Sequence, residues 1–195
     1  GRGRATAMPR APADFEVAAA AAGSAPSAAE ADDIIAWLCN CNEYAEWQKV
    51  IVSADKDFIQ LLDDKTLLFR PIQKEVLNTN IVIEKFGIHP RNFALARAMA
   101  GDPSDNLAGV PRVGLGTVAK RFSFLKEDND YFIDDILHEC QKEDNKLKIY
   151  KSVLDSERVI EENYNIMQLS SEDQSREMQN SLEISSKELY GSERC

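Results

Sequence analysis

Apolar residues along this chain alternate between short continuous runs and longer stripes with helical spacing. One continuous run falls within residues 49–54 and a second within 66–70, and 75–77 can pair with the second as a hairpin. Residues 30–47 instead repeat their apolar side chains every three or four positions, as one face of a helix does. Strands that alternate with helices predict an α/β fold with a parallel-rich sheet and flanking helices.

Turn-forming residues mark the expected helix ends. Thr79 is a candidate N-cap for a helix over 80–86 that Gly87 ends, and Pro90 suits the first turn of a helix that Gly101 ends. The remaining helices are expected over 57–62, 117–125 and parts of 130–167.

Composition separates the two ends from the middle of the chain. Residues 1–29 are of low complexity and residues 170–195 are rich in Ser, Glu and Gln, so we expect both segments to be disordered. Residues 127–195 carry 18 acidic and 8 basic side chains, which accounts for the whole net charge of −10. The acidity therefore belongs to the C-terminal third, and it does not exclude an anionic partner elsewhere.

Cysteine use and hydropathy indicate an intracellular protein without a membrane span. The four cysteines, of which Cys39 and Cys41 are separated by one residue, lack the spacing of a zinc knuckle, and we interpret them as reduced thiols. No apolar run approaches the roughly 20 residues that a membrane helix needs. The location is therefore expected to be cytoplasmic, as in bacteria or phage, or organellar or nuclear.

Three acidic groups are the candidate chemistry. The first opens the helix over 30–47, the second follows the strand at 49–54, and the third follows Gly101; together they comprise Glu30, Asp32, Asp33, Asp55, Asp57, Asp102 and Asp105. Ligands of an open α/β sheet gather at the carboxyl ends of its strands, where Asp55 lies. The helix antiparallel to that strand starts at the same end, which predicts that the seven carboxylates converge.

Clustered carboxylates stay ionised only beside a cation, because like charges at short range favour protonation. Carboxylate oxygens suit Mg²⁺ or Mn²⁺. Two such ions about 4 Å apart can hold the attacking and leaving oxygens of a phosphodiester displacement. The sequence therefore predicts two Mg²⁺ ions, which Mn²⁺ can replace.

A glycine-rich turn follows the third acidic group. The stretch "GVPRVGLGTVAKRF" begins at Gly109, contains Gly114 and Gly116, and places Thr117 as a candidate N-cap. Lys120 and Arg121 follow on the expected helix, and Arg112 lies in the turn. Glycine allows close approach of a backbone, so this segment predicts a helix–hairpin–helix that grips a DNA backbone without reading bases.

Three ordered motifs, "EADDIIAWL", "VIVSADKDFIQLL" and "GDPSDNLAGVPRVGLGTVAKRF", resemble the 5′→3′ exonuclease and flap endonuclease family. That family includes the 5′-nuclease domain of bacterial DNA polymerase I and the bacteriophage RNase H enzymes. The resemblance implies a two-metal nuclease of replication or repair that cuts 5′ ends, flaps or RNA primers on DNA or RNA–DNA hybrids. It also implies a PIN-like α/β fold followed by a helix–hairpin–helix and a helical C-terminal region.

The resemblance assigns roles to individual residues. Glu30, Asp32 and Asp33 would serve the first metal, and Asp55, Asp57, Asp102 and Asp105 the second, with Asp33, Asp55, Asp57 and Asp102 as the catalytic set. DNA would be held by the hairpin and the start of the next helix, through Gly109, Val110, Arg112, Gly114, Gly116, Thr117, Lys120 and Arg121. The hairpin carbonyls of the family can also bind K⁺. The partner is DNA, and we expect a monomer.

The family pattern also predicts an organisation for the chain. We expect an α/β nuclease core over 30–106 and a DNA-binding helical region over 107–169, between low-complexity ends at 1–29 and 170–195. The family begins with a strand that ends in a metal-binding Asp, followed by a basic helical arch. Both would precede Glu30, so we expect this chain to lack the first strand and the arch.

Two other functions compete with a nuclease. A catalytically impaired DNA-binding remnant of the family would keep the hairpin without holding two metals. A phosphatase of the haloacid-dehalogenase type also has a strand followed by Asp-x-Asp. However, Phe58 and Ile59 occupy positions where that class has small residues, and "FALARAMAGD" has helical spacing where it has a strand.

Overall fold

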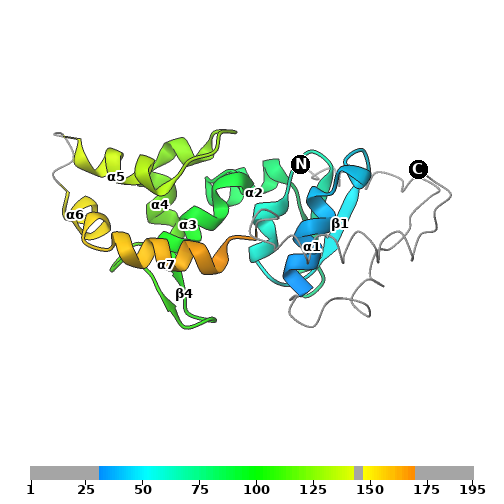
Figure 1. The fold of residues 1–195 in the computed structure, drawn as a ribbon, viewed down its shortest axis with the longest axis horizontal. Helices are drawn as coiled ribbons and strands as arrows, with labels where there is room; N and C mark the ends of the chain where they lie inside the picture. The colour runs from blue at the N-terminus through cyan, green and yellow to red at the C-terminus, as the bar shows by residue number, and fades with distance from the viewer. Residues whose placement is uncertain (1–30, 143–146, 170–195) are drawn as a thin grey trace, which may run out of the picture.

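The computed structural model describes residues 31–142 and 147–169. Glu30 and the two low-complexity ends lie outside these residues. Figure 1 shows an elongated molecule with the small sheet and α1 at one end and the later helices at the other. In chain order the elements are α1 (Ala31–Asn40), η2 (Asn42–Tyr44), β1 (Lys49–Val52), η3 (Asp57–Leu61), β2 (Thr66–Arg70), β3 (Glu75–Leu77), α2 (Thr79–Phe86), η4 (Pro90–Asn92), α3 (Phe93–Ala100), β4 (Gly101–Asp102), β5 (Leu107–Ala108), α4 (Leu115–Arg121), η5 (Ser123–Lys126), α5 (Ile133–Gln141), α6 (Lys148–Leu154) and α7 (Glu157–Met167), where η marks a 3-10 helix.

The main sheet has the strand order β1-β2-β3. β1 and β2 run parallel with Ile51 opposite Leu68, and β2 and β3 run antiparallel with Leu68 opposite Leu77. These three side chains share one face and are buried in the core. On the other face Val50 and Val52 stay exposed. The α/β fold expected from the sequence is confirmed.

Several predicted element ends differ in detail. The expected helix over 30–47 stops at Asn40 and resumes as the separate 3-10 turn η2. Thr79 is not an N-cap, because the preceding Asn78 accepts the hydrogen bond of Ile81 N–H with its side chain. Thr117 is not one either, since α4 already begins at Leu115.

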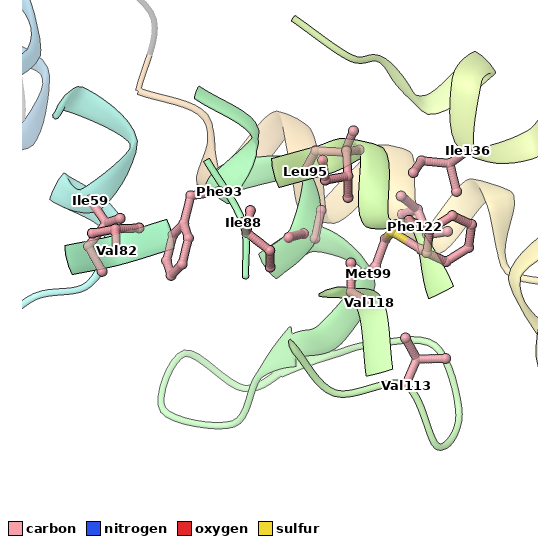
Figure 2. Close-up of a cluster of buried hydrophobic side chains, with 14 of the residues drawn as sticks. Ile59, Val82, Ile88, Phe93, Leu95, Met99, Val113, Val118, Phe122 and Ile136 are labelled. Atoms are coloured by element: carbon pink, nitrogen blue, oxygen red, sulfur yellow. The ribbon is translucent and has the colours of Figure 1, made fainter. Parts of the chain in front are cut away.

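A single buried core joins the sheet to the helices. Figure 2 shows side chains from successive elements in this core, among them Ile59 of η3, Val82 of α2, Met99 of α3 and Val118 of α4. The core extends on both sides of residue 106, so the predicted boundary there does not separate two cores. The division of the chain into two functional parts stays a prediction.

A close backbone contact fixes the segment after α3. Gly101 ends that helix with φ +74°, a conformation that favours glycine, and β4 then pairs with β5 so that Gly101 lies opposite Ala108. A Cβ built on Gly109 would lie 2.2 Å from the carbonyl carbon of Ala100 and 2.4 Å from the nitrogen of Gly101. The two backbones therefore touch, and they set where Asp102 lies.

We predict that Gly109→Ala lowers the free energy of unfolding by about 2 kcal/mol or more, because the new methyl group overlaps main-chain atoms that cannot turn away. Gly114→Ala is the matched control, since nothing lies within 4 Å of its added Cβ and its φ is −104°. Chemical denaturation of both variants measures the difference. Equal stability of the two variants would contradict this account of the contact.

Candidate active site

The loop after β1 presents two of the predicted carboxylates. Ser53 Oγ accepts from the amide of Asp55, and Asp55 Oδ1 accepts from the amide of Asp57 at 2.8 Å. These local bonds form a turn that starts η3 with Asp57 as its first residue. Asp55 is exposed and Asp57 is half-buried.

The β4–β5 hairpin presents the third acidic group. Asp102 Oδ1 accepts from the Ser104 amide at 2.8 Å and from the Ser104 hydroxyl at 2.5 Å. The hydroxyl bond, followed by the amide bond and the charge of Arg97, lowers the pKa of Asp102 although partial burial opposes it. Asp102 is therefore ionised at neutral pH, and Asp105 lies exposed in the turn beyond it.

Arg97 links these two carboxylate groups. Its Nη2 lies 3.0 Å from Asp57 Oδ1 and also donates to Asp102 Oδ2. Only 7% of the Arg97 side chain is exposed, against 20% for Asp57 and 13% for Asp102. A guanidinium thus occupies the space where two anions from distant parts of the chain meet.

Asp57 experiences the combined field of the group. Desolvation raises its pKa to about 6, Arg97 opposes that rise, and Asp55, Asp105 and Asp102 add to it. The carboxylates of two loops, some 45 positions apart in the sequence, are therefore close enough to repel one another.

Helix α7 holds the two loops at a fixed spacing. Near its C-terminal end, Met167 O accepts from Gln60 Nε2 of η3, and Gln60 Oε1 accepts from the Leu169 amide, both at 2.9 Å. Earlier in the same helix, the buried Asn163 donates from Nδ2 to the carbonyls of Ala98 and Ala108, also at 2.9 Å. One helix thereby contacts η3, which begins with Asp57, and the strand pair that carries Asp102.

Of the seven predicted ligands, Asp57 and Asp102 meet at Arg97, and Asp55 and Asp105 lie near enough to add to the raised pKa of Asp57. That these residues hold a metal stays a prediction. Asp32 and Asp33 lie half-buried in the first turn of α1, and Glu30 lies outside the described residues. That α1 contributes to the same site stays a prediction.

Three residues around these carboxylates were missed in the sequence: Arg97, Gln60 and Asn163. Arg97 had a signal, because a single charged residue in the apolar helix "FALARAMA" is buried only when it is paired. Gln60 and Asn163 had none, since their partners lie about 55 to 109 positions away in the sequence.

The carboxylates fit a divalent cation by chemistry but not by arrangement. Asp oxygens are the ligands that Mg²⁺ and Mn²⁺ prefer. As placed, however, no three Asp, Glu, His or Cys side chains within residues 31–142 and 147–169 gather closely enough to hold an ion. Arg97 is the cation between Asp57 and Asp102 in this arrangement.

The glycine-rich hairpin packs against α3 on one side and is open on the other. Val110 and Val113 are buried; the Val110 amide donates to Met99 O, and the Val110 carbonyl accepts from the Val113 amide. Arg112 is exposed and holds φ +67°, which is uncommon for a non-glycine residue. Lys120 is exposed on α4 and Arg121 is half-buried.

Comparison with known proteins shows which sequences this chain is similar to. Residues 18–87 match the family model described as "5'-3' exonuclease, N-terminal resolvase-like domain". The 5'-3' exonuclease of Buchnera aphidicola subsp. Schizaphis graminum is 41% identical over 100 residues, which are 50% of this chain and 35% of that protein. DNA polymerase I of Mycobacterium tuberculosis is 42% identical over 95 residues, which are 47% of this chain and 10% of that protein.

Solved structures share the fold. A bacteriophage T5 5'-exonuclease with bound zinc matches with a TM-score of 0.65 at 20% identity, covering 83% of this chain and 59% of that one. A T5 flap endonuclease in a complex with DNA and metal ions matches with a TM-score of 0.62, covering 80% and 60%. The chain spans about a third of the curated exonuclease and less than two thirds of the T5 chains.

Among the described residues no helix is long and apolar enough to span a membrane.

We predict that Asp57→Asn stabilises the metal-free protein at pH 7.5 by about 1 to 2 kcal/mol. The folded-state pKa of about 6 exceeds the ordinary value of 3.8, so the folded protein binds more protons between these values. Wild-type stability therefore falls as the pH rises from 4 to 6, and the advantage of the variant disappears near pH 4. Denaturation in EDTA across this range measures it, and a constant difference would contradict the raised pKa of Asp57.

Proposed function

We propose that this chain, whose residues 18–87 match the 5′→3′ exonuclease family model, acts as a divalent-metal-dependent 5′→3′ nuclease on DNA or RNA–DNA hybrids. The relatives are exonucleases and DNA polymerases in which the matched part is a fraction of the whole, so the activity of this chain is a proposal. Mg²⁺ is the proposed ion and Mn²⁺ its substitute, in a pair that would neutralise the charge of a phosphodiester during cleavage.

One observation carries the proposal: carboxylates from two separate loops meet at one place. Asp55 and Asp57 follow β1, and Asp102 and Asp105 come from the β4–β5 hairpin, yet Asp57 and Asp102 share Arg97, and Asp55, Asp102 and Asp105 all raise the pKa of Asp57. A stable fold gains nothing from placing these anions near one another, because their repulsion opposes folding. Cation-dependent chemistry gives a reason for it, and T5 relatives were solved with metal ions.

The glycine hairpin supports DNA as the partner. Gly114 and Gly116 have no positive φ, and an added Cβ on either would meet no atom within 4 Å. Gly114 is the N-cap of α4, a position that glycine suits. Gly116 lies in the first turn, where glycine costs stability, so it has no evident reason within the fold. Close approach of a DNA backbone supplies one, with Lys120 and Arg121 on the same helix as candidates to contact its phosphates. We also propose that the hairpin carbonyls bind K⁺. The protein is proposed to be a monomer and to work inside the cell.

A second function is favoured by the arrangement of the carboxylates. Within the described residues no three potential ligands close around an ion, and Arg97 pairs with two of them. A chain that binds DNA through the hairpin without cleaving it is therefore the alternative. The phosphatase has no such support, since the helix α3 leads into Asp102 where that class has a buried strand.

We predict that the chain cleaves a 5′-flap duplex when Mg²⁺ or Mn²⁺ is added, and that Asp55→Asn or Asp102→Asn each reduces the rate about a hundredfold or more by removing negative charge from the cation site. The measurement is single-turnover cleavage of an end-labelled flap, with circular dichroism to verify folding. Asp64→Asn is the matched control, because Asp64 is an exposed acid in the loop before β2.

Full activity in both carboxylate variants would refute the assignment of the site. Salt-sensitive DNA binding without cleavage by the wild-type chain would instead establish the non-catalytic alternative. Turnover of a small phosphate monoester with no effect on DNA would contradict both functions.

We predict that Lys120→Ala combined with Arg121→Ala weakens duplex binding for every sequence and lowers the slope of log K against log salt by about 1 to 2, since each phosphate contact releases counterions. Fluorescence anisotropy from 50 to 200 mM salt measures the slope. Lys151→Ala on α6 is the control and should leave the slope unchanged. An unaltered slope in the double variant would remove the last turn of α4 from the interface.

A further inference from the structure

Arg97 is the one charged residue of an otherwise apolar helix. α3 has the sequence FALARAMA, and every side chain from Phe93 to Met99 is buried, Arg97 included at 6% exposure. Burial of a guanidinium is costly unless anions and hydrogen bonds compensate for it. A basic residue in the last turn also suits the helix dipole, but that interaction works equally well for an exposed side chain. The burial of Arg97 therefore requires its carboxylate partners.

The partners of Arg97 are the residues that the proposed function assigns to a metal. Nη2 binds Oδ1 of Asp57 and Oδ2 of Asp102, while the other oxygen of Asp102 is bound by Ser104. The guanidinium contributes one positive charge between these two carboxylates. A divalent ion that approached the same oxygens would find their lone pairs partly used by Arg97 and Ser104. The positive charge of the guanidinium would also repel it.

Arg97 is also incompletely satisfied where it lies. Its Nε is buried and has no hydrogen-bond partner. An unpaired buried donor costs free energy. The two carboxylates that compensate for the burial of the guanidinium both contact its Nη2 atom.

We propose that the guanidinium of Arg97 is an internal counter-ion at the cation position between Asp57 and Asp102, and that a divalent ion binds these carboxylates in competition with it. This inference rests on the proposed function, because it concerns the metal site of the nuclease. It explains why the carboxylates lie together while no three of them close around an ion in the described part of the chain. Arg97 is a positioning residue, since it acts on the ion through the carboxylates.

The test is calorimetric titration of the full chain with Mn²⁺, without DNA, in wild type, Arg97→Met and Arg97→Lys. Met keeps the length and apolar stem of the side chain and removes its charge. We expect Arg97→Met to bind Mn²⁺ at least about tenfold more tightly than wild type, because the repulsion between a buried positive charge and a divalent ion is of that size. Arg97→Lys keeps the charge, so its affinity for Mn²⁺ should stay within about threefold of wild type. Arg91→Met is the matched control, as Arg91 pairs with Asp128 and Asp130 on the surface and should leave the affinity unchanged.

Two results separate the possible failures. Mn²⁺ binding by wild type with equal or weaker binding by Arg97→Met would overturn the counter-ion role and leave the proposed metal-dependent function intact. Absence of Mn²⁺ binding in wild type and in Arg97→Met would overturn the proposed metal site itself, and the counter-ion role with it.

A measurement on the wild-type chain covers the case in which Arg97→Met does not fold. The Nε–Hε signal of Arg97, assigned by its loss in Arg97→Lys, is followed by ¹⁵N NMR during a Mg²⁺ titration. We expect this signal to move and to saturate together with Mg²⁺ binding, while the signal of Arg91 stays in place. A stationary Arg97 signal in protein that binds Mg²⁺ would overturn the proposal.

Discussion

The ion pair of Arg97 with Asp57 and Asp102 is the interaction on which the rest of the site depends. It joins the loop after β1 to the β4–β5 hairpin, two segments that no strand pairing connects. Without a cation between them the carboxylates would repel one another. Burial, with a smaller contribution from the neighbouring carboxylates, raises the pKa of Asp57 although Arg97 lowers it. The same interaction explains how Asp57 and Asp102 can lie close together and why Arg97, and not a metal ion, lies between them.

The scaffold behind this ion pair is built from long-range contacts. Gln60 ties η3 to the end of α7, and Asn163 ties the middle of α7 to the backbone on either side of β4. The close approach of Gly109 to Gly101 then fixes the hairpin against the end of α3. Rigid elements therefore carry the geometry, while the carboxylates lie in the loops between them, as is common for functional sites.

The sequence predicted the local part of this structure well. The ranges of β2 and β3, the end of α2 at Gly87 and the end of α3 at Gly101 agree with the prediction, because apolar runs and glycines act locally. The N-caps were wrong at Thr79 and Thr117. Asn78 and Thr79 are both able to cap, so the choice between them depends on a single hydrogen bond that composition does not reveal.

The sequence indicated carboxylates for the candidate site but did not indicate Arg97. The order of the acidic motifs predicted that Asp55, Asp57, Asp102 and Asp105 converge; the structure joins Asp57 to Asp102 through Arg97, and the metal site itself stays a prediction. A metal was the cation that the chemistry of the motifs suggested, whereas the cation in the structure is a side chain from α3. Arg97 could have been recognised as a charge within an apolar helix, but its pairing with Asp57, 40 positions away, depends on the tertiary fold.

A double-mutant cycle between Arg97 and Asp57 tests the central claim most directly. The free energies of unfolding of wild type, Arg97→Met, Asp57→Asn and the double variant are measured in EDTA at pH 7.5. If Arg97 compensates the charge of Asp57, then Asp57→Asn stabilises the Arg97→Met protein more than it stabilises wild type, by about 1 kcal/mol or more. Equal effects of Asp57→Asn in the two backgrounds would contradict the account, because they would mean that the guanidinium and the carboxylate do not interact.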